Sequence, residues 1–579
     1  TGAAGADAAE VDACVKRGEL VMAAELRGLG LTQGGVIGDR DDKLGLEWKD
    51  AFAAYLLGTS YLAKRAEDVL VFNGEIYNYR ELGGDAARSD TEVLLGLLQR
   101  EGENCLPRLA GMFAFAFYRS GSGEALLARD AYGIKPLYYR IDGGTLAFSS
   151  DSRLLRRPGD DVDAGALRDF FLWGSVPEPA TVTKQIRQVP AGHFLRWHDG
   201  KAEIARWHAP DLRSHRAMSR AEAVGRTRSA LEECAGRHLV SDVPVGIFLS
   251  GGIDSTVLLA LARRALGEEA EIRTFSVGFD DPAFDESGAA RRTAERFRAR
   301  HTEWRMTPEE GGAEIAAYLA AMDQPTIDGF NTWCVSKLAR REGMKVVLSG
   351  LGGDEWFAGY GSFARLPQLR GFYSTMPGPA RRLLARVFDA ARAGSPWRRL
   401  AAFLRGGGTW LEAFHAQRGV FNPEEAAALV EAFAGCRPPP AEWGSGPLPS
   451  TAREIAGWLE ITRYMRNQLL RDSDVFSMAH GLELRVPFVD IRLGRSLLEL
   501  PPEFRLEAGK RLLVDAVPEI PEWIRRRPKQ GFRFPFQQWM RGGFGAMLDD
   551  AASASPVPLA SWYRTWAVAV MRESLRGNP

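Results

Sequence analysis

A glycine-rich turn between an apolar run and a helical pattern carries the strongest chemical signal in the chain. Residues 243–249 predict a short buried strand that ends at Ser250-Gly251-Gly252, and a helical pattern follows at once. A strand, a Gly-rich turn and a helix N-terminus together direct free backbone N–H groups at an anion. Ser250 and Ser255 add hydroxyl donors, and Asp254 favours a Mg²⁺ ion between itself and a phosphate. The turn lacks the lysine of a Walker-type loop, so it predicts another class of nucleotide site.

A second glycine-rich loop supplies the acidic partner that such a metal site needs. The apolar run 345–348 predicts a strand, and Ser349-Gly350-Leu351-Gly352-Gly353-Asp354-Glu355 follows it. In parallel α/β sheets, ligands bind beyond the carboxyl ends of the strands. Asp254 and Asp354 are therefore expected to converge on one Mg²⁺ that bridges phosphate oxygens. For the first loop taken alone the alternative is an ordinary strand-to-helix turn, and for the second it is a helix-capping turn.

Strands that alternate with helical stretches position these loops. The predicted buried strands are 243–249, 272–279, 301–305 and 345–348. This alternation predicts an α/β domain with a parallel sheet, followed by a largely helical C-terminal part. Asp323-Gln324-Pro325, Asp328 and Trp333 lie between the strands and are predicted to face the substrate.

The first two hundred residues have a different character, because strands dominate there and phosphate-type loops are missing. Residues 112–118 alternate as a half-buried strand does, and further short strands are expected near 69–72 and 145–149. The pattern predicts a sandwich-like α+β domain. We therefore predict two domains, 1–205 and 206–579.

The overall composition disfavours several functional classes. The 74 basic residues balance the 74 acidic ones, so no positive excess favours a nucleic-acid partner. No apolar run reaches the length of a membrane-spanning helix. The five cysteines are scattered without a C-x-x-C pair, which disfavours a disulfide framework or a zinc site and fits a reducing cytoplasm. We expect a soluble cytoplasmic enzyme acting on small molecules, with a homodimer as an option.

Several strings together resemble the glutamine-hydrolysing asparagine synthetase family. They are N-G-E-I-Y-N-Y at 73–79, S-D-T-E at 89–92, A-R-D-A-Y-G-I-K-P-L-Y-Y at 128–139 and S-G-G-I-D-S-T at 250–256. The resemblance implies a class II glutamine amidotransferase domain with the N-terminal-nucleophile fold, an αββα sandwich. It also implies that a synthetase domain of the ATP pyrophosphatase type follows.

In the glutaminase half, the resemblance implies roles for four residues. Asn73 and Gly74 match the family's oxyanion-hole residues, and Glu75 and Asp90 match carboxylates that bind the glutamine ammonium group. The family's nucleophile is an N-terminal Cys, whereas residue 1 is Thr, and the expected H-R-G-P-D-D segment is largely missing. Three interpretations stay open. Thr1 is the nucleophile, or the domain has no glutaminase activity, or residues 1–68 differ from the native sequence.

In the synthetase half, the resemblance implies the nucleotide site and its neighbours. Lys529, in the R-x-K-x-G-F match, would neutralise charge on the leaving pyrophosphate. Glu483 and Arg485 match a second substrate-binding segment, although a buried ion pair is the alternative. Leu351 stands where many asparagine synthetases carry a carboxylate, so the acceptor acid stays open. The predicted ATP- and pyrophosphate-binding residues are Leu249, Ser250, Gly251, Gly252, Asp254, Ser255, Val277, Ser349, Gly350 and Lys510.

The predicted reaction is ATP-dependent amide formation. A carboxylate attacks the α-phosphate of Mg²⁺-bound ATP to give an acyl-adenylate and pyrophosphate, and ammonia from glutamine then attacks the acyl group. Aspartate is the leading acceptor, which would place the enzyme in asparagine biosynthesis. Two alternatives stay open: an intramolecular amide closure like that of β-lactam synthetases and lasso-peptide cyclases, and a non-catalytic nucleotide-binding scaffold.

Overall fold

The computed structural model forms two compact units. It describes residues 24–27, 30–37, 60–65, 68–84, 88–212, 215–281, 284–391, 394–444, 446–527 and 545–576. The first unit takes the chain up to Asp163 together with Glu178–Pro210, and the second takes Ala164–Pro177 and the chain from Asp211 onward. The helix Ala164–Trp173 therefore belongs to the second unit, although the sequence placed it in the first domain. The division 1–205 and 206–579 stays a prediction.

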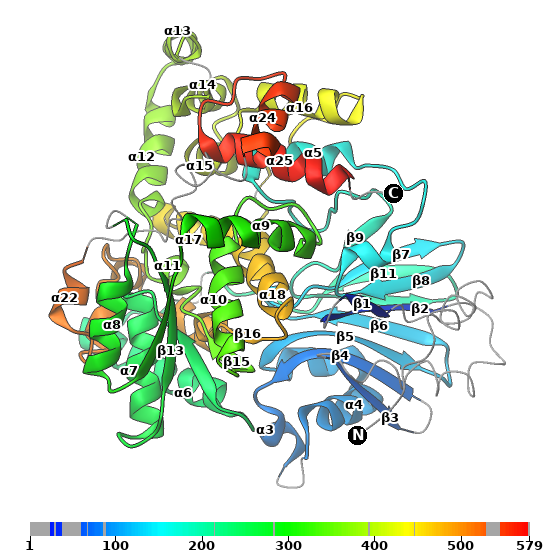
Figure 1. Cartoon of the computed structure of the whole chain (residues 1–579), viewed down its shortest axis with the longest axis vertical. Coiled ribbons are helices and arrows are strands. Elements are labelled where there is room, and N and C mark those ends of the chain that lie inside the picture. Colours follow the sequence, from blue (N-terminus) through cyan, green and yellow to red (C-terminus); the bar gives the residue numbers. More distant parts are fainter. Residues whose placement is uncertain are drawn as a thin grey trace. The chain divides into compact units, whose positions relative to one another are not determined.

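The first unit contains two antiparallel sheets (Figure 1). One sheet has the strand order β1 (Ala24–Arg27), β2 (Gly30–Ile37), β8 (Thr145–Ser149), β7 (Tyr138–Asp142) and β9 (Ile186–Gln188). The other has the order β11 (Lys201–Arg206), β10 (His193–His198), β6 (Glu124–Arg129), β5 (Gly111–Arg119), β4 (Asp68–Ile76) and β3 (Ser60–Arg65). The helices of this unit are α3 (Tyr79–Gly83), α4 (Asp90–Glu101) and the 3₁₀ turns Gly102–Arg108 and Ser152–Leu155.

Strand β5 shows how the layers form. Its phenylalanines, among them Phe115, share a core with Leu94 and Leu98 of α4. Its alanines, on the opposite face, share a second core with Leu146 and Phe148 of the other sheet. The expectation of a half-buried strand was therefore wrong, because both faces of β5 are covered. The large side chains face the helix layer and the small ones let the two sheets approach, as an αββα sandwich requires.

The A-R-D-A-Y-G-I-K-P-L-Y-Y string forms a buried turn of the first unit. Asp130 accepts hydrogen bonds from the backbone N–H groups of Tyr132, Gly133, Ile134 and Lys135 at 2.8–3.1 Å. Burial raises the pKa of Asp130, and these backbone donors oppose that rise. The string thus shapes a loop of the unit.

The second unit is built on a five-stranded parallel sheet with the order β14-β13-β12-β15-β16. Four of these strands were predicted: β12 (Val245–Phe248), β13 (Arg273–Gly278), β14 (Arg300–Arg305) and β15 (Val346–Leu348). The fifth, β16 (Glu483–Arg485), was not. Helices α6 (Arg220–Leu239), α7 (Ile253–Leu266), α8 (Ser287–Arg296) and α10 (Phe330–Arg341) surround this sheet (Figure 1).

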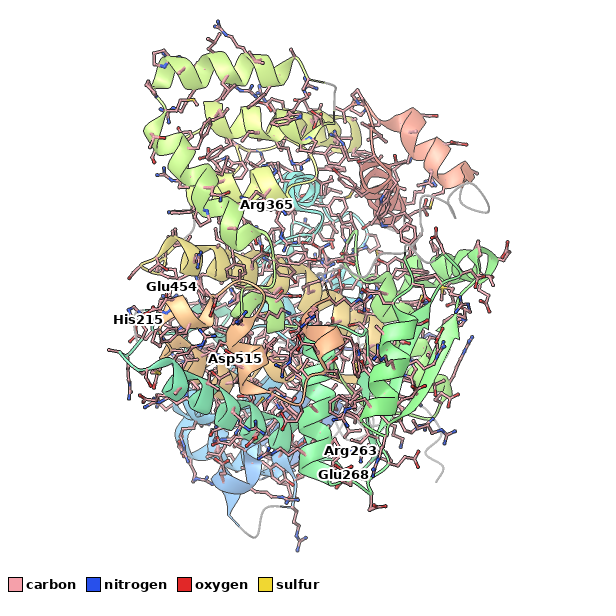
Figure 2. All side chains as sticks on the ribbon, turned by 90° about the vertical axis from the view of Figure 1, so that its left-hand side faces the viewer. His215, Arg263, Glu268, Arg365, Glu454 and Asp515 are labelled. Atoms are coloured by element: carbon pink, nitrogen blue, oxygen red, sulfur yellow. The ribbon has the colours of Figure 1, made fainter. Side chains whose placement is uncertain are left out.

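Helix α7 follows the first glycine-rich turn and is fixed at both ends. It begins after Gly252 and buries Val257, Leu258 and Leu261. At its end, the guanidinium of Arg263 donates to the carbonyls of Gly267, Glu268 and Ala270 (Figure 2). Those carbonyls belong to the loop that follows the helix, so Arg263 ties this loop to the last turn of α7. At the other end, the Thr256 hydroxyl donates to Gly252 O at 2.8 Å and ties the first turn of α7 to the glycine-rich turn.

Helices form the rest of the second unit, and those from α12 to α16 gather with α24 and α25 away from the sheet (Figure 1). One segment, Glu460–Leu470 (η3), is a π-helix. Among the described residues, no helix combines the length and apolarity needed to cross a bilayer. The remaining helices are α5 (Ala164–Trp173), α9 (Pro308–Ala321), α11 (Gly353–Trp356), α12 (Ser362–Thr375), α13 (Gly378–Asp389), α14 (Pro396–Arg405), α15 (Trp410–Arg418), α16 (Pro423–Ala434), α17 (Ala452–Leu459), α18 (Arg471–Met478), the 3₁₀ turn Pro487–Val489, α19 (Ile491–Leu498), α20 (Pro502–Arg505), α21 (Arg511–Ala516), α22 (Glu522–Arg525), α24 (Gly545–Ala554) and α25 (Trp562–Arg576).

Candidate active site

The two glycine-rich loops meet in one cavity of the second unit. The cavity has a volume of about 350 Å³ and lies at the carboxyl ends of β12, β13 and β15. The backbone ladder continues into both loops, because Leu249 N–H donates to Phe275 O and Ser349 N–H donates to Arg485 O, each at 2.9 Å. The structure brings all predicted ATP- and pyrophosphate-side residues to this lining, together with Leu351 and Asp354. We call this cavity the loop cavity.

A buried lysine joins the two predicted metal ligands. Lys510 contacts the carboxylate of Asp254 and lies 2.5 Å from that of Asp354. Burial of the ammonium opposes its charge, but the two carboxylates outweigh burial and raise the pKa of Lys510. The two aspartates come from different strand ends and converge as expected. Two carboxylates facing a cavity form a donor set that suits Mg²⁺, and the lysine shows that a cation already fits between them.

The first loop has the geometry of an anion cradle. Gly251 has φ 69°, a conformation that favours glycine, and a Cβ there would lie 2.8 Å from that of Ala289. The Ser255 hydroxyl receives the Ser250 N–H at 3.3 Å and donates to Gly252 O at 3.3 Å. The turn is thus tied to the first turn of α7, whose N-terminus carries free N–H groups and a partial positive charge.

The structure adds residues to the loop cavity that the sequence did not single out. Glu355 follows Asp354 and accepts a hydrogen bond from the Tyr360 hydroxyl at 2.9 Å. Burial, reinforced by the charge of Asp354, raises the pKa of Glu355 to about 8. Asn331 also lines the cavity. The Asp-Glu pair after the glycines was the signal for Glu355, whereas Tyr360 and Asn331 are brought in by tertiary packing alone.

The predicted charge partner from the R-x-K-x-G-F match is described only in part. Lys529 lies outside the described residues. Arg527, at the start of the same match, lines the loop cavity, donates to Gly251 O at 3.2 Å and pairs with Glu286 at 3.2 Å. The segment therefore does reach the phosphate loop, and Arg527 makes the contact.

Residues of the second predicted substrate segment make contacts that hold the fold together. Arg485 pairs with Glu483 at 2.7 Å and donates to the carbonyls of His238 and Val240. Asp490 receives the backbone N–H groups of Arg492 and Leu493 and so begins α19. Neither Glu483 nor Arg485 is among the described residues that line the loop cavity. The geometry matches the ion-pair alternative, and a role in substrate binding stays a prediction.

In the first unit, the predicted glutamine-side residues gather at the end of β4. Asn73, Gly74 and Glu75 pair with Ala114, Phe113 and Met112 of β5. Asp90 opens α4, and its carboxylate accepts the N–H of Ile76 at 3.0 Å, directly after this stretch. Asn73 is buried, while Glu75 and Asp90 are half-buried. Thr1 lies outside the described residues.

Comparison with known proteins gives the family. Residues 226–577 match the family model described as asparagine synthase, and residues 60–208 match that of a glutamine amidotransferase domain. The chain belongs to the asparagine synthase family. Membership makes it a ligase that forms C–N bonds, with a glutamine amidotransferase domain before an ATP pyrophosphatase-type domain.

Individual relatives in the asparagine synthase family cover most of the chain. Asparagine synthetase (glutamine-hydrolyzing) 1 of Bacillus subtilis is 30% identical over 491 residues, which span 82% of this chain and 76% of that protein. Asparagine synthetase B (glutamine-hydrolyzing) of Escherichia coli is 33% identical, spanning 56% of this chain and 58% of its own length. Amidase chyE of Penicillium rubens is 28% identical, spanning 82% and 78%.

Proposed function

We propose that this protein activates a carboxylic acid with ATP and Mg²⁺ as an acyl-adenylate and then forms an amide. The observation that carries the proposal is the convergence of Asp254, Asp354 and Lys510 beside two glycine-rich loops in the loop cavity. An acid that attacks the α-phosphate displaces pyrophosphate, whose developing charge needs cations and N–H donors. Asp254 and Asp354 would hold Mg²⁺, which would neutralise negative charge on the phosphates.

The residues of the chain account for three parts of this reaction. The N-terminus of α7 and the hydroxyls of Ser250 and Ser255 present donors to a phosphate. Lys510 supplies a buried positive charge that is retained at neutral pH, because the two carboxylates raise its pKa. The apolar Leu249 and Val277 line the same cavity and offer packing surface to a nucleoside.

The nitrogen source proposed is glutamine, hydrolysed in the first unit. Asn73 and Gly74 would bind the oxyanion, and Glu75 and Asp90 would bind the glutamine ammonium group. The amidotransferase match and the grouping of these residues at the end of β4 support this assignment. Aspartate is the reference acceptor, because the relatives include proteins named asparagine synthetase.

The decisive experiment follows the carboxyl oxygen. The purified chain is incubated with ATP, Mg²⁺, glutamine and an ¹⁸O-labelled acid, and the products are analysed by mass spectrometry. An acyl-adenylate pathway gives pyrophosphate and AMP that carries one ¹⁸O. Formation of ADP and phosphate, or the absence of pyrophosphate with every acid, would refute the proposal. Glutamate release, measured in parallel and compared with an Asp90→Asn variant, tests the glutaminase half.

A further inference from the structure

A second and larger cavity adjoins the loop cavity in the second unit. Its volume is about 630 Å³, and Asn331 lines both cavities. Tyr360, which lines the loop cavity, also faces the guanidinium of Arg418 at 4.5 Å, and Arg418 lines the second cavity. A molecule in one cavity would therefore share a wall residue with a molecule in the other. We call the second cavity the aromatic cavity.

The lining of the aromatic cavity is unusual for a site that receives a small polar acid. Among the described residues it contains three tryptophans, three tyrosines and three phenylalanines. Cavities of roughly 300–1,000 Å³ with apolar and aromatic walls hold ligands of drug-like size. Aspartate is short and polar and has no apolar surface to cover such walls. Size and chemistry both favour an occupant with a large apolar or aromatic body.

A polar side chain is placed in this aromatic wall. Gln468 is only 5% exposed and lines the cavity. Its amide offers an acceptor and two donors to an occupant of the cavity. Gln468 belongs to the π-helix η3, and π-helical turns are frequent at functional sites.

Two charged residues near Gln468 are already engaged, so they define the wall. Arg418 pairs with Glu460 at 2.8 Å and lies over the Tyr464 ring at 4.0 Å. Asp328, which the sequence placed on the substrate side, lines the cavity and accepts the N–H of Gly329 at 2.8 Å. These contacts fix the wall, and the amide of Gln468 is suited to hydrogen-bond an occupant.

We propose that the acid activated by this enzyme carries a large aromatic body, which the aromatic cavity binds. Its carboxyl group reaches the α-phosphate in the loop cavity, its ring system fills the aromatic cavity past Asn331, and Gln468 hydrogen-bonds a polar group on that body. Leu351, an apolar residue of the loop cavity, fits such a substrate. The inference depends on the proposed acid activation for its chemistry but on the cavity for its binding.

The test separates binding from chemistry. Binding of indole-3-propionate, 3-phenylpropionate, L-aspartate and succinate to the full chain is measured by calorimetry with Mg²⁺ and α,β-methylene-ATP, which cannot release pyrophosphate. The aromatic acids are expected to bind at least tenfold more tightly than L-aspartate. Equal or tighter binding of L-aspartate, or no binding of either aromatic acid, would overturn the inference.

A variant locates the bound acid. Gln468→Leu is expected to weaken the binding of indole-3-propionate, which offers an N–H donor, about fivefold or more. The affinity for L-aspartate should stay unchanged. The matched control is Gln368→Leu on the exposed face of α12, which should change neither. Thermal midpoints show whether each variant is folded. An unchanged affinity in folded Gln468→Leu would remove Gln468 from the proposal.

A turnover measurement then tests the proposed function and the inference on the aromatic cavity separately. Pyrophosphate release with ATP is measured for the same four acids. If the aromatic acids bind tightly but no acid releases pyrophosphate, the proposed function fails and the binding site stands. If L-aspartate alone is activated and the aromatic acids do not bind, the proposed function stands and the inference fails.

Discussion

Lys510 places its ammonium group 2.5 Å from a carboxylate oxygen of Asp354, and the same group contacts Asp254. The backbone of Lys510 has φ 56°, in the left-handed region that non-glycine residues seldom adopt. Such a conformation persists where the surrounding contacts impose it. The two ion pairs supply that constraint, and they place one positive charge between the carboxylates of both glycine-rich loops.

Replacing this lysine should impair both chemistry and stability. Lys510→Met removes the cation that would face the leaving pyrophosphate, and we expect pyrophosphate release to fall by about 100-fold or more. It also leaves two buried like charges, and breaking a buried ion pair costs about 3–5 kcal/mol. Added Mg²⁺ should restore part of the lost thermal midpoint, because a divalent cation can neutralise both carboxylates.

The control for this variant is Lys337→Met. Lys337 pairs with Glu314 at 2.5 Å, and neither residue lines the loop cavity. Its thermal midpoint should fall without any recovery on addition of Mg²⁺, and pyrophosphate release should be retained. An equal effect of Mg²⁺ on the two variants would contradict a metal site at Asp254 and Asp354.

A glycine beside the ion pairs offers a steric test. A Cβ on Gly359 would lie against Asp354 Oδ1 and 2.5 Å from Lys510 Cε. Gly359→Ala must displace one of these groups, and overpacking of this kind costs about 1–3 kcal/mol. We expect pyrophosphate release to fall at least tenfold. Gly371→Ala on the exposed face of α12 meets open space and should stabilise the protein by about 0.5–1 kcal/mol without a change in rate.

The sequence was sufficient to predict the strands and loops whose signals are local. Continuous apolar runs predicted the strands β12, β13 and β15, and the glycines that follow β12 and β15 predicted the loops. The rule that ligands bind beyond strand ends then predicted the meeting of Asp254 and Asp354, which the structure shows. Strand β16 was missed because two of its three residues, Glu483 and Arg485, are charged, although their ion pair had been the alternative to a role in substrate binding.

Other long-range contacts do not follow from local sequence patterns. Lys510 lies 256 positions after Asp254, and only the family resemblance, not a local pattern, placed it at the same site. The aromatic cavity draws its wall from α10, α15, η3 and α25, which are widely separated in the chain. Its aromatic residues look like ordinary core positions in the sequence, so only tertiary packing distinguishes a filled core from a cavity. Asp328 was an exception, because its place between two strands made it a candidate.

A buried histidine should make the protein sensitive to acid. Burial, reinforced by Arg399, lowers the pKa of His415 to about 3, and its ring packs against Trp173 and Trp443. The unfolded chain binds a proton near pH 6.5 and the folded chain does not, so stability falls as the pH drops from 6.5 toward 3. The free energy of unfolding, measured with urea, falls between pH 7.5 and pH 5. For His415→Phe this fall should be about 2 kcal/mol smaller than for the unmodified protein.

The comparison for this histidine is an exposed one. His215→Phe changes a side chain at the surface (Figure 2). The difference in the free energy of unfolding between pH 7.5 and pH 5 should be the same as in the unmodified protein. His238 and His480, whose pKa values burial lowers to about 4, add to the acid sensitivity that remains in both variants. If the free energy of unfolding of His415→Phe falls as much between pH 7.5 and pH 5 as that of the unmodified protein, His415 is protonated in the folded state at pH 5.

Two neighbouring arginines allow a test of the segment that reaches the phosphate loop. Arg527 donates to Gly251 O at 3.2 Å and pairs with Glu286, whereas Arg526 pairs with Glu522 at the surface. Arg527→Ala releases the loop and removes a positive charge from the loop cavity, so the KM for ATP should rise about tenfold. A hydrogen bond to a charged group contributes about 1.5–3 kcal/mol, which corresponds to that factor or more. Arg526→Ala should leave the KM unchanged, because its charge lies in water. Equal KM values for both variants would mean that Arg527 has no part in binding the nucleotide.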